Sequence, residues 1–251
     1  MGRTKIEYVT HTWNPITGCS PCSEGCENCY ARRTARAIGR IGKGGYADGD
    51  DPFAVRWHPE RLDEPTRYRG RKRILVCSMS DIFHEYIDPA WRAAIWEVMG
   101  ATRHTYLLLT KRSYRMVRAV CVHERLPILP NLQWGVTVES QEHHFRARDL
   151  LYIPAAVRWI SAEPLLGPLD LREYLGRHRI NWLVVGGETD PGARPMRHEW
   201  AEDLCRQALD AEVPFFFKQW GPRNAEPVLL GRYWREIPET MPDFGAQERL
   251  F

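Results

Sequence analysis

Six short apolar runs recur along the chain, and each one ends in small, polar or charged residues. They are RILVCSMSD (73–81), TYLLLTKR (105–112), LQWGVTVES (132–140), VRWISAEP (157–164), NWLVVGGE (181–188) and PFFFKQWG (214–221). Continuous apolar runs of this length are typical of strands that are buried on both faces, as in parallel sheets. With EYVTHTW (7–13) as a first strand, the sequence predicts seven strands.

The segments between these runs can form helices. In DPAWRAAIWEVMGAT (88–102) and RHEWAEDLCRQALDAEV (197–213), apolar residues recur at three- and four-residue steps. The runs follow one another at roughly 24 to 32 residues, a comfortable length for a right-handed βα unit. This α/β pattern fits either a (β/α) barrel, complete or partly open, or a doubly wound open sheet.

Polar side chains at the ends of the runs favour the barrel. A barrel gathers its active site at the carboxyl ends of its strands, and no glycine-rich dinucleotide fingerprint follows the first strand here. The strand-end residues of interest are Ser80, Asp81, Thr110, Lys111, Glu139, Glu163, Glu188, Lys218 and Gln219. Strand ends are often polar simply because loops are polar. Six such ends in succession nevertheless predict one ring-shaped site.

The chain is long enough to need no covalent cross-links. It has 251 residues, of which 43% are apolar, and we expect a single α/β barrel-like domain over residues 1–251. A long inserted loop at about 42–73 is a candidate lid or substrate-facing loop, and an irregular C-terminal tail is expected from about 222. No run approaches the ~20 apolar residues that span a bilayer, and the N-terminus lacks a secretory signal. We therefore expect a cytoplasmic protein with no membrane association.

Four of the seven cysteines lie within eleven residues, directly after the predicted first strand. Cytoplasmic thiols stay reduced, so such a cluster indicates a metal site rather than disulfides. The spacing is Cys19-x2-Cys22-x3-Cys26-x2-Cys29. Closed zinc sites usually draw ligand pairs from two separate hairpins, whereas one curling loop can hold a cube-shaped [4Fe–4S] cluster. We favour the cluster and keep zinc as the alternative.

Several blocks of the sequence together resemble one protein family. They are WNPITGC, GCENCYA, SMSDIFHE, LLTKR, WGVTVES, RWISAEPLLGPLDL, LVVGGETDPGARPM and PFFFKQWG, in order over about residues 9 to 221. These blocks are similar to the phage-associated three-Cys-motif family, a family of unknown function whose cysteine loop resembles that of radical S-adenosylmethionine proteins. The resemblance implies a barrel with a [4Fe–4S] cluster on Cys19, Cys26 and Cys29. Cys22 departs from the family pattern.

A second three-cysteine pattern overlaps the first. Cys22-x3-Cys26-x2-Cys29 is the spacing of the cluster loop in radical S-adenosylmethionine enzymes, so it stays open which three thiols bind and whether Cys22 is a fourth ligand. Three protein thiolates leave one iron free to bind S-adenosylmethionine, which supplies the radical chemistry. Four thiolates close the cluster and indicate electron transfer or a structural role.

If S-adenosylmethionine binds, the strand-end residues are its candidate contacts. Glu188 could hold the ammonium group while Gly186 and Gly187 allow a close backbone approach, and Lys111 or Arg194 could hold the carboxylate. The remaining candidate contacts, for ribose hydroxyls or a second cation, are Ser80, Asp81, Glu139 and Glu163. Each strand-end glutamate could equally pair with an internal Lys or Arg for structural reasons.

Nucleic acid or a nucleotide is the expected substrate. The net charge of +3 is too small to argue for it, but the runs ARRTARAIGR (31–40) and RYRGRKR (67–73) are basic. Aromatic groups beside Arg and Lys suit stacking on bases, so Arg194, Lys218 and Trp220 are candidate substrate contacts. His84, His143 and His144 show no zinc-binding spacing, and we interpret them as core or solvent-facing residues.

Three functions stay open at this point. The first is an iron–sulfur, radical S-adenosylmethionine-like enzyme that repairs or modifies nucleic acid or a nucleotide. The second is a zinc or iron–sulfur protein that binds nucleic acid or a partner without chemistry of its own, and a protein partner encoded nearby belongs to this setting. The third is a barrel hydrolase that uses the strand-end carboxylates and has a structural metal site. The sequence assigns no catalytic residue.

Overall fold

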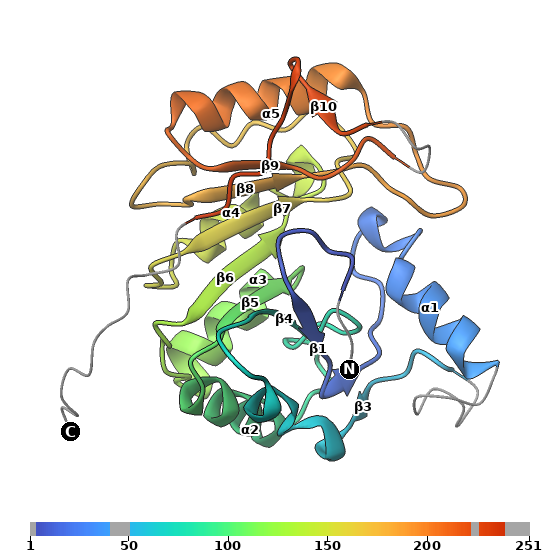
Figure 1. Cartoon of the computed structure of the whole chain (residues 1–251), viewed down its shortest axis with the longest axis vertical. Coiled ribbons are helices and arrows are strands. Elements are labelled where there is room, and N and C mark those ends of the chain that lie inside the picture. The colour runs from blue at the N-terminus through green and yellow to red at the C-terminus, as the bar shows by residue number, and fades with distance from the viewer. Residues whose placement is uncertain (1–3, 41–50, 222–225, 239–251) are drawn as a thin grey trace.

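Seven parallel strands form one sheet in the order β1-β4-β5-β6-β7-β8-β9 (Figure 1). The computed structural model describes residues 4–40, 51–221 and 226–238. The strands are β1 (His11–Trp13), β4 (Arg73–Val76), β5 (Thr105–Thr110), β6 (Leu132–Thr137), β7 (Arg158–Ala162), β8 (Trp182–Val185) and β9 (Phe215–Phe217). All seven predicted strands are present. The sheet is a partial (β/α) barrel, which confirms the predicted fold class.

Every neighbouring pair in this sheet is parallel. The register places Trp13 opposite Val76 at one edge and Val185 opposite Phe217 at the other. Parallel strands all end at the same edge of a sheet. The polar residues that follow the seven strands therefore lie at one end of the partial barrel, as the sequence predicts.

Helices connect most of the strands. They are α1 (Tyr30–Gly39), α2 (Pro89–Ala101), α3 (Ser113–Val117) continuing as the π-helical segment η4 (Arg118–His123), α4 (Phe145–Leu150) and α5 (His198–Asp210), with short 3-10 turns η1 (Glu24–Cys26), η2 (Pro59–Arg61), η3 (Glu64–Arg67) and η5 (Gln141–His143). The expected alternation fails between β7 and β8, because residues 163–181 contain no helix. Leu165, Leu169 and Leu171 of this segment are buried individually, without a helical turn. Within the described residues, no helix is both long and apolar enough to cross a membrane.

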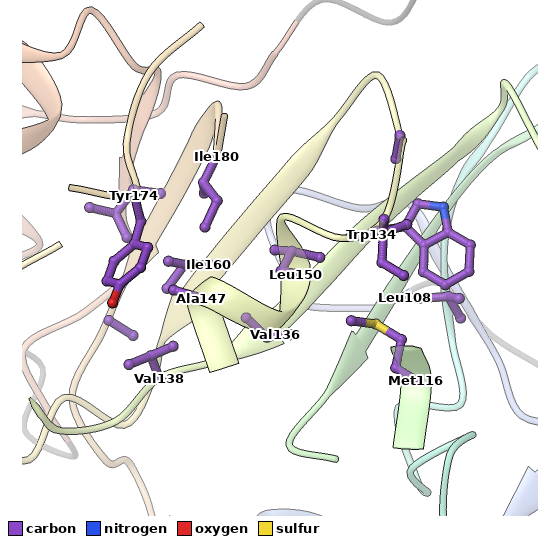
Figure 2. Packing of buried hydrophobic residues seen from close by; sticks show 14 of the residues in the cluster. Leu108, Met116, Trp134, Val136, Val138, Ala147, Leu150, Ile160, Tyr174 and Ile180 are labelled. Carbon is purple, nitrogen blue, oxygen red and sulfur yellow. The ribbon is translucent and has the colours of Figure 1, made fainter. Parts of the chain in front are cut away.

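The helix-covered face of the sheet holds the larger part of the core (Figure 2). Strand β6 shows the pattern, since Trp134 and Val136 at alternate positions contribute to this cluster. Figure 2 shows Ala147 and Leu150 of α4 over the sheet residues Val136 and Ile160, with Met116 of α3 near Trp134. The short helices after β5 and β6 are held in place by this packing, because helices of this length are not stable in isolation.

The concave face of the sheet carries a smaller aromatic cluster. The ring of Tyr8 meets those of Trp159, Trp182 and Phe216 edge-on, with ring centroids 5.5–5.9 Å apart. These residues come from β7, β8 and β9, so the chain just before β1 fills the interior of the partial barrel. Burial raises the pKa of Tyr8 well above its ordinary value.

Two segments are more ordered than the sequence indicates. Residues 51–73 of the long insertion include β3 (Arg56–Trp57), which pairs antiparallel with β2 (Ile16–Thr17), and residues 41–50 lie outside the described part of the chain. Beyond 225, β10 (Val228–Leu229) and β11 (Arg232–Tyr233) form a hairpin instead of the expected irregular tail. Trp234 explains the difference, because its buried ring packs on Phe215 and its carbonyl accepts the amide of Phe217 at the edge strand β9.

Candidate metal centre

The cysteine loop begins at Gly18, directly after β2, and is fixed on both sides. Gly18 has φ +88°, and a Cβ at this position would lie 2.0 Å from the carbonyl oxygen of Ala54, so only glycine fits. The hydroxyl of Ser80 donates to the Gly18 carbonyl over 2.6 Å, and the Cys19 amide donates to Phe53. The loop is therefore held between the end of β4 and residues 53–54 of the insertion.

The four clustered cysteines lie around one place at the carboxyl end of the sheet. Nη1 of Arg112 lies 3.5 Å from the sulfur of Cys19 and 3.8 Å from that of Cys22. Cys22 hydrogen bonds to Cys26, and Cys29, the residue before α1, packs with Cys19 in a small cluster around Phe53. The fold thus brings together all four thiols that the sequence predicts as ligands.

The spacing of the sulfurs suits a body larger than a single ion. No three of the four lie within 4.8 Å of one another, in a search of the described residues. Four thiolates around one zinc at 2.3 Å would lie about 3.8 Å apart. A [4Fe–4S] cluster separates its ligands more widely, because each thiolate binds a different corner. The donor set fits the cluster without closing further, whereas zinc would require the loop to contract.

The charges around the loop favour thiolates. A hydrogen bond from Cys22 and the charge of Lys111 lower the pKa of Cys26 to about 5, although burial opposes this shift. The same hydrogen bond raises the pKa of Cys22. Burial and the neighbouring Asp81 raise the pKa of Cys19 to about 12, against the effect of Arg112. One thiol is therefore set to ionise first, and the others need a positive partner.

Arg112 is the main contact that the sequence interpretation missed. Its guanidinium is buried and donates to Asp81 over 3.3 Å, to the Ser20 carbonyl over 3.0 Å and to the carboxylate of Glu85 over 3.3 Å. These contacts join the cysteine loop to the ends of β4 and β5. The signal was present in the LLTKR block, where Arg112 follows Lys111, but only the first of the two cations was assigned.

Asp81 holds this corner of the site together. Its carboxylate accepts hydrogen bonds from the Thr110 hydroxyl at 2.7 Å and from the Lys111 and Phe83 amides at 3.1 Å, besides Arg112. Within the described part of the chain, Lys111 has no side-chain hydrogen bond or ion pair, and its charge acts on Cys26. Lys111 is therefore an available cation beside the thiols, whereas Asp81 is fully engaged.

The end of β6 contacts the cysteine loop through a chain of polar groups. Glu139 is completely buried, pairs with Arg146 at 2.7 Å and accepts a very short hydrogen bond from the Ser23 hydroxyl. Glu24 of the loop accepts from His143 at 2.7 Å. Burial would raise the pKa of Glu24, but the hydrogen bonds of His143 and Ser140 lower it to about 2. His143 is thus a site residue, not the core or solvent-facing histidine that the sequence indicates.

The end of β8 contacts the opposite side of the loop. Glu188 accepts from Asn28 at 2.9 Å and pairs with Arg194 at 2.5 Å, and these hydrogen bonds lower its pKa despite burial. The two glycines before it accommodate the protein itself: a Cβ on Gly187 would lie 2.1 Å from the Trp220 carbonyl oxygen, and one on Gly186 would meet Gln219. In this structure Glu188 and Arg194 bind each other, which was the structural alternative for this glutamate.

The ends of β7 and β9 form a further pair. The Lys218 ammonium lies 2.5 Å from Glu163, which also accepts from Gln219 at 2.8 Å. The ring of Trp220 stacks on His198 at 3.9 Å, and its indole nitrogen donates to the Val228 carbonyl. Glu163 and Lys218 lie at the same end of the sheet, as predicted, and they too are paired with each other.

The sequence as a whole matches one described family. The model of the family described as "protein of unknown function (DUF5131)" matches residues 3–238. The chain belongs to the DUF5131 family. No curated protein and no solved structure matches it. The expected membership in a family of unknown function is therefore confirmed at this coarser level.

For this DUF5131 chain, the structure gathers the predicted residues but changes the interpretation of several. Each strand-end carboxylate has a cationic partner within the described residues: Asp81 with Arg112, Glu139 with Arg146, Glu163 with Lys218, and Glu188 with Arg194. The pairs offset the cost of placing charged groups at the barrel mouth. Their roles toward a cofactor or a substrate stay predictions.

Proposed function

We propose that the protein is an iron–sulfur enzyme of the radical S-adenosylmethionine type that modifies or repairs nucleic acid or a nucleotide. The observation that carries the proposal is the position of the four-cysteine loop. It lies at the carboxyl end of a parallel sheet, where barrels perform their chemistry, with the cations Arg112 and Lys111 directly beside it.

Cys19, Cys26 and Cys29 would hold a [4Fe–4S] cluster. The spacing of their sulfurs supports a cluster over a single zinc ion. Arg112 and Lys111 would offset the negative charge that three thiolates bring to a partly buried site. When bound, such a cluster supplies the electron for reductive cleavage of S-adenosylmethionine and so for hydrogen abstraction from a substrate.

Lys111 is the residue we assign to the carboxylate of S-adenosylmethionine, because it is the cation at the thiols that has no partner among the described residues. Glu188 would take the ammonium group only by exchanging its contact with Arg194. Cys22 contacts Arg112 and Cys26 from within the loop, so it lies beside the iron that S-adenosylmethionine would bind. A free Cys22 thiol distinguishes the enzyme from a closed, four-thiolate cluster.

The paired carboxylates argue against the hydrolase alternative. Acid–base hydrolysis needs carboxylates that can face a substrate and a water molecule. In the described part of the chain, the four strand-end carboxylates all bind protein cations instead. The cysteine loop is the group at this end of the sheet with unassigned chemistry, and we place the function there.

The test begins with anaerobic purification followed by iron, sulfide and zinc analysis. We expect close to four irons and four sulfides per chain, together with broad visible absorption. The protein is then mixed with S-adenosylmethionine and a strong reductant, and 5′-deoxyadenosine is measured. Cys22→Ala should retain both the cluster and the cleavage.

Other results would select another function. Stoichiometric zinc without iron would support a metal protein that binds nucleic acid or a partner without chemistry of its own. An intact cluster that neither binds nor cleaves S-adenosylmethionine, with iron lost in Cys22→Ala, would show a closed cluster. Cleavage that survives in Cys26→Ala would contradict the proposed ligand set.

A further inference from the structure

A cavity of about 410 Å³ opens beside α3 and η4, outside the metal centre. Its floor is the buried side chain of Phe83 together with the ion pair of Arg92 and Glu124. The volume lies in the range of small-molecule binding sites. None of these residues is a contact of the cysteines, so the cavity needs its own explanation.

The floor of this cavity is electrically neutral. Arg92 binds Glu124 with two hydrogen bonds of 2.8 and 2.5 Å, and it also donates to the carbonyls of Ile82 and Ile87. This bidentate pair uses the full charge of the one carboxylate among the residues that line the cavity. The wall is therefore free to act as a cationic surface.

Two exposed arginines of the wall have no anionic partner in the described chain. Arg115 donates from Nε to the Phe83 carbonyl over 2.9 Å, which fixes its direction and leaves the terminal nitrogens unpaired. Arg118 contacts only neutral groups, donating to His123 over 2.9 Å and to the Tyr114 hydroxyl over 2.8 Å. Two oriented guanidinium groups over a neutral floor form a site for an anion with several oxygens, such as phosphate.

Tyr114 adds a surface for stacking. Its side chain is 62% exposed at the mouth of the cavity, and the Arg118 guanidinium lies over one face at 5.5 Å from the ring centroid. An exposed aromatic ring beside arginines that bind phosphate is the combination by which proteins hold single-stranded nucleic acid. The phosphate would be held by the arginines, and a base would stack on the ring.

We infer that this cavity binds the backbone of single-stranded nucleic acid through Arg115, Arg118 and Tyr114. Phe83, at its floor, precedes His84, which accepts a 2.8 Å hydrogen bond from the Ser20 hydroxyl in the cysteine loop. Arg115 likewise lies one helical turn after Arg112, the arginine at the thiols. A strand held in the cavity therefore has its neighbouring nucleotides beside the metal centre.

The cavity is independent of the cluster, whereas the identification of the bound strand as the substrate rests on the proposed function. Two separate measurements distinguish the two ideas. Strand binding is followed by the fluorescence anisotropy of a labelled single-stranded oligothymidylate at several salt concentrations. Iron is determined on the same samples of the purified protein.

The test variant is Arg115→Ala/Arg118→Ala, and its matched control is Arg177→Ala/Arg179→Ala. The control removes the same charge from two exposed arginines that precede β8, at the opposite end of the sheet. We expect the test variant to bind about tenfold or more weakly and its salt dependence to fall by a slope of about 1. The control should stay within about twofold of the wild type.

Tyr114 gives a second measurement that charge alone would not affect. Tyr114→Ala should weaken binding at least about fivefold, whereas Tyr114→Phe should bind like the wild type because the stacking surface is kept. The inference is overturned if the wild type does not bind the strand, if both double variants lose affinity equally, or if Tyr114→Ala has no effect. Loss of iron in every preparation would instead refute the cluster and leave strand binding intact.

Discussion

Nη1 of Arg112 lies 3.5 Å from the sulfur of Cys19 and 3.3 Å from the carboxylate of Asp81. One buried guanidinium thus connects the cysteine loop to the end of the neighbouring strand β4. Burial would lower the pKa of Arg112, but Asp81 and the thiols raise it, so the charge is firmly retained. The metal centre and the sheet are therefore coupled through a single side chain.

Replacement of Arg112 should affect both stability and metal binding. Arg112→Met keeps most of the length but leaves Asp81 without its cation, and we expect the free energy of unfolding to fall by about 3 kcal/mol. Iron content should also fall, whereas Arg112→Lys should recover part of it. The control is Arg172→Met, which breaks the exposed pair with Asp203 and should cost less than about 1 kcal/mol in urea unfolding. Wild-type iron and stability in Arg112→Met would refute this coupling.

The thiols themselves give the most direct prediction. Alanine at Cys19, Cys26 or Cys29 should abolish the visible absorption and reduce iron to background, because each provides one of three ligands. Cys121→Ala is the control, since that cysteine is exposed in η4, away from the loop. Iron and sulfide analysis decides the matter. Full iron in any of the three ligand variants would show that its thiol is not a ligand.

The elements that were predicted correctly have strong local signals. The seven strands could be found because each is a short apolar run that is buried from both sides, such as Leu132–Thr137. The convergence of their ends follows from parallel pairing alone. The cysteine loop was located by its spacing, which requires no knowledge of the fold.

The partners of the site residues could not be predicted in the same way. Glu139 pairs with Arg146 on the following helix, and Glu188 with Arg194 in the next loop. In sequence, each arginine is one of many, and only the folded backbone decides which one reaches a given carboxylate. The hairpin after residue 225 was missed for a similar reason, because its strands are two residues long and depend on Trp234 packing against β9.

His58 predicts a dependence of stability on pH. Burial and the charge of Arg61 lower its pKa below the ordinary 6.5, and its ring contacts the Thr17 hydroxyl at 2.8 Å. The folded state therefore favours neutral His58, and this stability is present above pH 6.5 and is lost as the pH falls below it. The urea midpoint should be lower at pH 5.5 than at pH 7.5, by less in His58→Gln than in the wild type (the two pH values bracket the ordinary pKa of about 6.5). Equal shifts in the two proteins would exclude His58 as the cause.

Gly18 should be essential for the cysteine loop, for a reason that a second glycine can isolate. Gly18→Ala would place a Cβ 2.0 Å from the backbone oxygen of Ala54, in addition to the strain of φ +88°. Gly70 has a similar φ of +67° but no atom within 4 Å of the added Cβ, so Gly70→Ala should cost only about 1 kcal/mol of strain. We expect Gly18→Ala to cost at least about 2 kcal/mol more than that, and to lose iron because the start of the loop moves. Urea unfolding and iron analysis of both variants measure the difference, and equal costs with full iron would mean that the contact with Ala54 does not position the cysteines.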